Sequence, residues 1–234
     1  MKLKTNLHSH SFGDPQDPAI KYTSKELIDY ASSLGFGVLA ITHHKSFAYT
    51  EELRKYAESK NILLISGIEL NITKQKKHLL VLNCEKSIES VKTFEDLREY
   101  KAKHPEIFVI APHPYFPRRS CLGNLVEENI NLFDAIEHSW FYSKRKNYNK
   151  KAEEIAKKYN LPFISTSDTH WLTKLNKDYA EIEIEEKTVE TVFEAIREGK
   201  FQNTTRPKRF ITEMLVPLVI YMIKDYVARI KRIF

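Results

Sequence analysis

The chain has 234 residues, of which 42% are hydrophobic and 29% charged, enough for one sizeable core in a single globular domain. Its formal net charge of +6 comes from residues 200–234, where eight basic residues outnumber two acidic ones. The remaining body is therefore neutral, which argues against a nucleic-acid-binding surface there. Two distant cysteines, Cys84 and Cys121, and an N-terminus without an apolar leader favour a reducing cytoplasm over export.

The chain begins with alternating polar and apolar residues at 2–7, a pattern that predicts a strand. His8 and His10 follow it. Because residues two apart in an extended chain point to the same face, the two imidazoles should lie side by side as candidate metal ligands. A loop rich in Gly and Pro then brings two carboxylates, Asp14 and Asp17, near this pair.

Helices and short apolar strands alternate along the rest of the chain. Helical spacing of apolar residues predicts helices at 24–34, 50–60, 94–103, 124–129, 144–159 and 188–198. Apolar runs predict strands at 38–41, 63–68, 78–82, 108–111, 133–136, 162–166 and 180–184. Such repeats predict a mainly parallel sheet that closes into a barrel or forms a doubly wound sheet.

One connection is too short for a crossover helix. The strands at 63–68 and 78–82 should therefore pair as a hairpin, which brings His78 towards Glu69.

Metal-ligand residue types recur where the predicted strands end. The residues concerned are His8, His10, His44, Glu69, His113, Asp168 and His170. In parallel barrels the active site lies at this edge, and five separate strand ends that each supply an imidazole or carboxylate are poorly explained by core packing. So many ligands exceed the needs of one ion, so we expect two or three ions with Glu69 as a bridge. Ions of this kind make hydroxide available at neutral pH and hold a phosphoryl group, which indicates hydrolysis.

These motifs, taken together, resemble the polymerase and histidinol phosphatase (PHP) family over roughly residues 3–201. The matching motifs are His8-Ser9-His10, Thr42-His43-His44, Gly67-Ile68-Glu69, the strand that starts at His78, Ala111-Pro112-His113-Pro114 and Ser167-Asp168-Thr169-His170. The resemblance implies an α/β fold, a distorted (β/α)7 TIM-like barrel, over residues 1–205. It also implies two or three divalent ions (manganese, iron or zinc) and phosphoester hydrolysis.

The resemblance further implies how the ligands are shared among the ions. One ion would take His8, His10, Glu69 and Asp168; a second, Glu69, His78 and His113; a third, His44, His170 and an acid from the loop after the first histidine pair. The loop differs in length from the family pattern, so Asp14 and Asp17 both qualify, and we favour Asp14.

Other residues are candidates for catalysis and substrate binding. His43 stands where the family usually has Asp, and it is either an acid/base group or a packed neighbour of the ligands. His43 or His170 would protonate the leaving group. Arg118 and Arg119 either bind phosphate oxygens or are solvated loop charges, and His138 could hydrogen-bond the substrate or a ligand.

The sequence thus predicts a metal-dependent phosphoesterase in which metal-bound hydroxide attacks a small phosphate monoester or nucleotide. The alternatives are a nuclease acting on oligonucleotide phosphodiesters, with nucleic acid as a partner only in that short form, and a noncatalytic, metal-stabilised PHP-like binding module. The neutral body disfavours the nuclease, and the near-complete ligand set disfavours the inert module.

The segment 206–234 forms a basic, apolar tail of predicted helical character. Its apolar run at 214–223 contains Pro217 and falls short of the roughly 20 residues that a spanning helix needs. We expect it to pack on the barrel or to lie as an amphipathic helix against a membrane surface or another subunit.

Overall fold

The computed structural model describes residues 1–230 of the chain, whereas residues 231–234 of the predicted tail lie outside the described part. The described strands are β1 (Lys2–Asn6), β2 (Phe36–Ala40), β3 (Leu63–Ile65), β4 (Gly67–Ile72), β5 (Lys77–Leu82), β6 (Phe108–Ala111), β7 (Ala135–His138), β8 (Phe163–Ser165), β9 (Tyr179–Glu183) and β10 (Phe201–Thr204). The described helices are α1 (Ser24–Ser33), α2 (Glu51–Ser59), α3 (Phe94–Lys103), α4 (Leu125–Glu128), α5 (Asn149–Lys158), α6 (Val189–Arg197) and α7 (Val216–Ile230). The α/β class expected from the sequence is confirmed.

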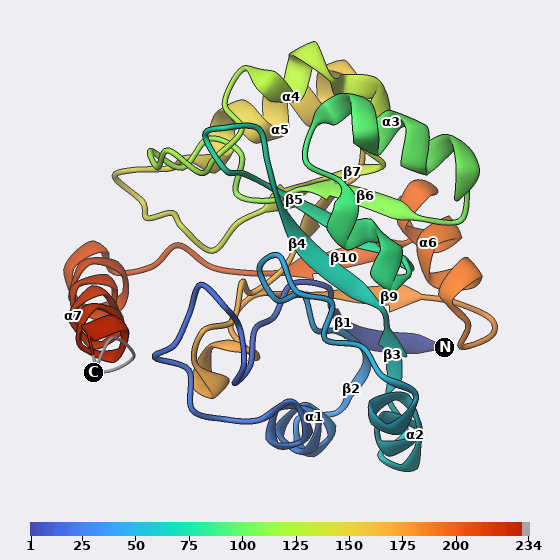
Figure 1. Ribbon diagram of the computed structural model, residues 1–234, viewed down its shortest axis with the longest axis horizontal. Coiled ribbons are helices and arrows are strands. Elements are labelled where there is room, and N and C mark those ends of the chain that lie inside the picture. Colours follow the sequence, from blue (N-terminus) through green and yellow to red (C-terminus); the bar gives the residue numbers. More distant parts are fainter. Residues whose placement is uncertain (231–234) are drawn as a thin grey trace.

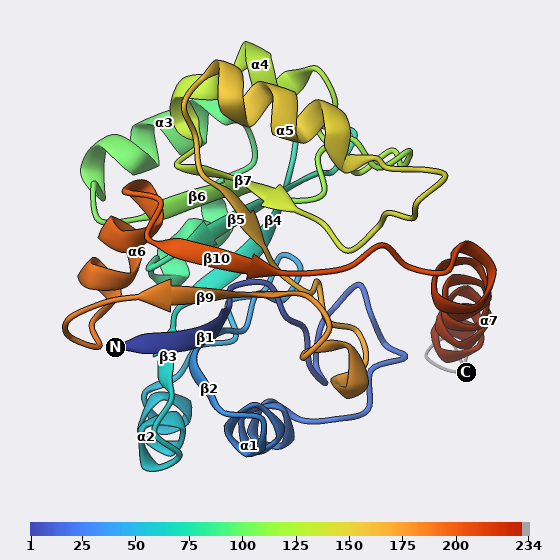
Figure 2. The ribbon, with the colours of Figure 1, turned by 180° about the vertical axis from the view of Figure 1, so that it is seen from behind.

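The strands form two five-stranded sheets, in the orders β10-β9-β1-β2-β3 and β4-β5-β6-β7-β8 (Figures 1 and 2). In the first sheet β1, β2 and β3 are parallel, and β9 is antiparallel to both β1 and β10. In the second sheet β4, β5 and β6 are antiparallel, whereas β6, β7 and β8 are parallel. The expected mainly parallel order therefore holds for only half of the described strand pairs.

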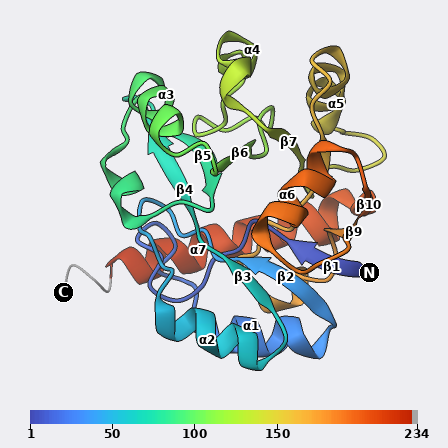
Figure 3. The ribbon, with the colours of Figure 1, turned by 90° about the vertical axis from the view of Figure 1, so that its right-hand side faces the viewer.

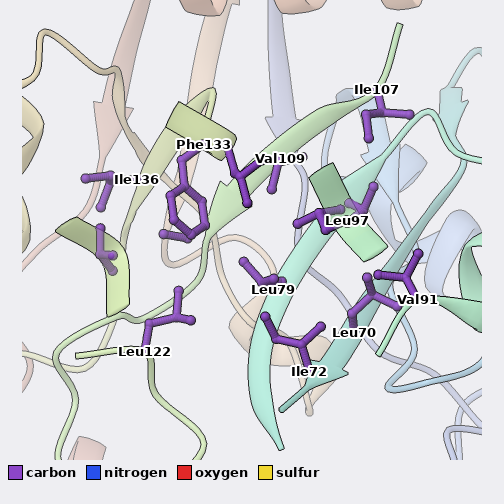
Figure 4. Close-up of a cluster of buried hydrophobic side chains, with 14 of the residues drawn as sticks. Leu70, Ile72, Leu79, Val91, Leu97, Ile107, Val109, Leu122, Phe133 and Ile136 are labelled. Atoms are coloured by element: carbon purple, nitrogen blue, oxygen red, sulfur yellow. The ribbon is translucent and has the colours of Figure 1, made fainter. Parts of the chain in front are cut away.

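The central core lies between the two sheets, because its buried side chains come from both. Val38 and Ile182 of the first sheet belong to the same apolar cluster as Leu80 and Ile110 of the second. Helices α1 and α2 cover the first sheet, and α3, α4 and α5 cover the second (Figure 3). Figure 4 shows the cluster under α3, in which Leu97 lies among side chains of β4, β5 and β6.

Local sequence signals explain several helix ends. Thr23 caps α1 through a reciprocal pair of hydrogen bonds with Glu26, as its position before an apolar repeat predicts. The helix predicted at 144–159 instead begins at Asn149, because Ser143 and Lys146 close a turn in which the Ser143 N–H donates to the Lys146 carbonyl at 2.7 Å.

The closure of a seven-stranded barrel is not confirmed, because no continuous ladder joins the two sheets within residues 1–230. They meet through isolated bridges, His44 with Glu69 and Ser9 with Thr169. Between β8 and β10, the side chain of Asn203 in β10 takes the place of backbone pairing. It accepts a hydrogen bond from the Ser165 N–H and donates one to the Phe163 carbonyl, both at 2.7 Å. Both isolated bridges fall within the metal-ligand motifs, so the sheets are connected where the chemistry is expected.

None of the helices in the described part of the chain is long and apolar enough to cross a membrane.

Candidate metal centre

The predicted ligands converge in one buried cluster at the ends of strands from both sheets. His8, His10 and His44 follow strands of the first sheet, and Glu69, His78, His113, Asp168 and His170 lie in or after strands of the second. Four groups of donor atoms from this cluster and from Asp14 and Asp17 are each compact enough to hold an ion, with all atoms of a group within 4.8 Å of one another. The spatial convergence on which the predicted chemistry depends is therefore present.

Glu69 is the centre of this cluster. Its Oε1 lies 2.7 Å from His78 Nδ1 and 3.2 Å from His113 Nε2, and its Oε2 lies 2.9 Å from His44 Nε2 and 3.3 Å from His8 Nε2. Burial alone would raise the pKa of the Glu69 carboxyl, but the neighbouring imidazoles, His78 first, hold that pKa well below its usual range. A hairpin brings His78 to Glu69, as the sequence predicted, but its first strand is β4, whereas residues 63–65 of the predicted strand form β3 and pair with β2 in the other sheet.

His8 and His10 direct their Nε2 atoms at the same carboxylates. Each Nε2 lies 3.4 Å from Asp168 Oδ1, and they lie 3.3 and 3.5 Å from Glu69 Oε2. Nδ1 of each ring is occupied by another buried carboxylate, from Glu137 and Asp14 respectively, at 2.8 Å. This arrangement fixes which nitrogen faces the cluster.

The two loop aspartates have different positions. Asp17 Oδ2 lies 3.0 Å from His44 Nδ1 and 3.2 Å from His170 Nε2, and Asp17 lines the cavity described below. Asp14 lies deeper, 2.8 Å from His10 Nδ1 and 3.0 Å from His44 Nδ1, and it accepts the His44 backbone N–H at 2.9 Å. Both aspartates belong, with His10 and His44, to one donor group compact enough to hold an ion, so the expectation of Asp14 stays a prediction. Because Asp17 also faces His170 and the cavity, we propose Asp17 as the loop ligand and Asp14 as the support of two histidines.

Five buried polar atoms in this cluster lie 2.7–3.4 Å from an atom of opposite charge type but make no hydrogen bond with the described residues. They are His8 Nε2, His10 Nε2, Asp17 Oδ2, Glu69 Oε2 and His78 Nδ1. Buried polar atoms are normally paired, and five that converge on one place match the donors that a cluster of divalent cations would satisfy. Imidazole nitrogens and carboxylate oxygens suit manganese, iron and zinc alike.

A buried carboxylate that sequence reasoning missed, Glu137 of β7, supports two of the histidines. It lies 2.8 Å from His8 Nδ1, accepts the His113 backbone N–H at 2.5 Å and accepts the hydroxyl of Thr166. Although burial opposes it, the carboxylates around His8, Asp168 first, raise the pKa of that imidazole to about 10. The sequence signal for this role is an acidic residue near the end of an apolar strand, directly before His138.

Cys121 also contacts a predicted ligand. Its thiol sulfur lies 3.3 Å from Nδ1 of His113, and its side chain is buried. In the sequence, Cys121 stands out only as one of two distant cysteines.

The two candidate acid/base histidines differ in location. His43 is buried against Ser11, whose hydroxyl oxygen and backbone nitrogen lie 2.7 and 3.2 Å from His43 Nε2. Burial lowers the pKa of His43 to about 4. His170 lines the cavity; burial would lower its pKa, but Asp17 and Asp168 raise that pKa to about 9. His43 is therefore placed as a packed neighbour of the ligands.

The predicted substrate-binding residues are also separated. Arg118 and Arg119 lie exposed at the rim of the cavity. His138 packs edge-on against the rings of Tyr142 and Phe163, at 5.1 and 4.8 Å, and does not line the cavity. The structure therefore gives no support to substrate binding by His138.

A cavity of about 560 Å³ opens directly above the cluster. Its base is formed by Asp17, His44, Glu69, His78, His113, Asp168 and His170. Five aromatic side chains, Phe116, Trp140, Phe141, Trp171 and Tyr221, contribute to its walls. This volume suits a small ligand.

Comparisons with known proteins agree with this geometry. A family model described as PHP-associated matches residues 146–201, and no curated protein matches the sequence. The fold is similar to a two-domain protein from Bacteroides vulgatus that contains a predicted PHP-like metal-dependent phosphoesterase, at 19% identity and a TM-score of 0.65. That match covers 88% of this chain and 65% of the other, so the chain spans just under two thirds of that protein's length.

Two further solved structures share the fold. PsfC from Pseudomonas syringae is 14% identical with a TM-score of 0.61, over 97% of this chain and 98% of that one. The lesion-specific endonuclease PfuEndoQ from Pyrococcus furiosus is 15% identical with a TM-score of 0.60, over 87% of this chain and 58% of that one. The resemblance to the polymerase and histidinol phosphatase family that the sequence motifs indicate is therefore confirmed: this chain is PHP-like in its fold and carries a PHP-associated segment.

Proposed function

We propose that the chain is a metal-dependent phosphoesterase that hydrolyses a small phosphate monoester or nucleotide. The observation that carries the proposal is the set of unpartnered buried nitrogen and oxygen atoms around Glu69. Such a site is costly to build without cations, because each buried polar atom left unpaired costs about 1–3 kcal/mol. Divalent ions held there would supply a nucleophilic hydroxide at neutral pH and neutralise charge on the phosphoryl oxygens.

The described residues suggest a division of roles. Glu69 would bridge ions, Glu137 and Asp14 would orient His8 and His10, and the exposed rim arginines Arg118 and Arg119 would attract the phosphate and hold its oxygens in a fork. The first contacts of the substrate would thus be with positive charge at the rim, before it reaches the metal centre.

His170 is the cavity-lining member of the two proton-donor candidates, and we assign protonation of the leaving group to it in preference to His43. The same Nε2 atom faces Asp17 and is a possible ligand of a third ion. The two roles exclude each other at Nε2. A measured content of three ions per chain would assign His170 to the metal, and two ions would leave it for the proton.

The nuclease alternative gains one observation, the similar fold of a lesion-specific endonuclease. Against it, the cavity is of small-ligand size and the body of the chain is neutral. The noncatalytic alternative does not account for an open cavity above the donor atoms. We therefore retain hydrolysis of a small phosphoester as the function supported best.

The proposal is tested with Glu69→Gln, which keeps the size of the side chain and removes its charge. The protein would be loaded with manganese, iron or zinc, and assayed for metal content and for hydrolysis of phosphate monoesters, cyclic phosphates and short oligonucleotides. We expect Glu69→Gln to lose bound metal and at least a hundredfold in kcat, whereas Glu52→Gln, on the exposed face of α2, should change neither. If Glu69→Gln hydrolyses as fast as the parent, the activity arises elsewhere.

A further inference from the structure

The C-terminal helix α7 belongs to the tail that the sequence predicts either to pack on the barrel or to lie against a membrane surface or another subunit, and it contributes to the cavity. Leu218, Tyr221 and Met222 line the cavity together with the base residues. The Tyr221 ring lies edge-on at 5.2 Å from the ring of His170 and 5.1 Å from that of Trp171, and its hydroxyl donates to Asp17. One face of α7 is therefore in direct contact with the metal-ligand cluster.

Ion pairs and hydrogen bonds before α7 hold it at this place. Lys208 is buried and forms a 2.7 Å ion pair with Asp178, which is also buried. Further along, Glu213 pairs with Arg206 and accepts the backbone N–H of Arg209 at 2.8 Å. A buried lysine costs free energy unless it is paired, so the segment that leads into α7 has a specific attachment to the body.

The cavity has a second aromatic wall beside His113. Phe116 and Trp140 each stack on Phe141, with ring centroids 4.2 and 4.0 Å apart, and Phe141 lies edge-on at 6.4 Å from the ring of His113. A ligand in the cavity therefore meets aromatic side chains on two sides of the donor cluster, Phe141 beside His113 and Tyr221 beside His170.

We propose that Trp171, Tyr221 and Leu218 form a subsite for the alcohol part of the substrate, and that this part is a flat, apolar group of small size. The inference rests on the proposed function, because the phosphate must occupy the metal centre for the ester group to reach α7. Aromatic walls bind flat apolar groups by stacking and by burial of apolar surface, whereas a small alkyl or strongly polar alcohol gains little from them. The tail thus selects the substrate, and the catalytic unit extends through α7.

The test compares Tyr221→Ala with Tyr226→Ala, a matched control on the same helix whose side chain is 67% exposed. With the metal-loaded protein, Tyr221→Ala should lower the ratio of kcat/KM for phenyl phosphate to kcat/KM for methyl phosphate roughly tenfold, mainly through the KM for phenyl phosphate. Tyr221→Phe should keep the preference for phenyl phosphate, because the ring remains and only the hydrogen bond to Asp17 is lost. Tyr226→Ala should behave as the parent.

Binding without turnover separates this inference from the proposed function. Phenylphosphonate and methylphosphonate are not phosphoesters, and their binding can be followed by tryptophan fluorescence, since Trp140 and Trp171 line the cavity. We expect the parent to prefer phenylphosphonate and Tyr221→Ala to lose that preference, even if no ester tested is hydrolysed. Equal weakening of both phosphonates in Tyr221→Ala, or the same loss in Tyr226→Ala, would overturn the subsite.

Discussion

Two aspartates three residues apart in one loop differ in what their carboxylates contact. Both are buried, and imidazoles lower the pKa of both against the opposing effect of burial. Asp17 faces the cavity and has an unpartnered oxygen, whereas Asp14 faces inwards and its carboxylate accepts a backbone N–H. The sequence shows two acids near two histidines, and only the path of the loop decides which of them faces the cavity.

Substitution of each aspartate by asparagine should separate these roles. Asp17→Asn should lose one ion per chain, measured by mass spectrometry of the metal-loaded protein, with little change in stability. Asp14→Asn should keep the full metal count at saturating metal but lower the free energy of unfolding by about 1–3 kcal/mol, because the His10 and His44 contacts weaken. The reverse pattern would return Asp14 to the position of loop ligand.

Among the elements, β8 and β10 show how a side chain substitutes for strand pairing. The carboxamide of Asn203 donates to one backbone group of β8 and accepts from another, as a neighbouring strand would. A half-buried asparagine in a short strand gives no sequence signal for this role. The alternation of strands and helices, which predicts a barrel or a doubly wound sheet, therefore does not reveal how this side of the molecule is joined.

Asn203→Ala should lower the free energy of unfolding by about 1–3 kcal/mol, because it leaves the Ser165 N–H and Phe163 carbonyl without their partner. Urea denaturation followed by circular dichroism would measure the change. Gln202→Ala, at an exposed position of the same strand, is the control and should stay within about 0.5 kcal/mol of the parent. Equal stabilities of the two variants would show that the bridge contributes nothing.

Helix α7 has a second, outward face that is unusually apolar. Val219, Ile220, Ile223 and Tyr226 of α7 are each between 45% and 67% exposed, as is Ile211 just before the helix, and most large exposed apolar side chains of the described residues lie within residues 210–230. Exposed apolar side chains gathered in one segment favour an interaction surface. The sequence around this face is basic. Of the two contacts expected for the tail, an anionic membrane surface would complement this positive charge, whereas a second copy of the chain would bring like charges together.

We therefore expect the protein to sediment with vesicles that contain phosphatidylserine and not with vesicles of phosphatidylcholine alone. The double substitution Ile220→Glu and Ile223→Glu should abolish this binding, because it places negative charge on the apolar face. Analytical ultracentrifugation without lipid provides the counter-test. A stable dimer that the same substitutions dissociate would assign the face to another subunit.

Across the whole molecule, the sequence predicted the ligand cluster better than the architecture that holds it. Strand-end positions placed His8, Glu69, His113 and Asp168 in one site because the ends of neighbouring strands meet at one edge. The split into two mixed sheets, in which half of the described strand pairs are antiparallel, depends on long-range pairing that an apolar run does not encode. Glu137 was missed for a related reason, since its contacts come from distant parts of the chain.

Metal removal should act on the whole fold and not on activity alone. Ions that bind only the folded state stabilise it by about 2.7 kcal/mol at a hundredfold excess over Kd. Dialysis against a chelator should therefore lower Tm, measured by differential scanning calorimetry, and manganese or zinc should restore it. The Glu69→Gln protein should show no such response, and a parent protein whose Tm ignores both treatments would contradict a metal centre in this cluster.

The isolated bridges between the sheets have a mechanical consequence. Glu69 belongs to one sheet, while the histidines that follow β1 and β2 belong to the other, so cations shared among them would tie together two halves that little backbone pairing connects. Without ions, local unfolding should begin where the two sheets meet. In hydrogen exchange, the amide protons near Ser9 and His44 should then exchange sooner than those in the middle of either sheet. The ions would then stabilise the contact between the two sheets as well as take part in hydrolysis.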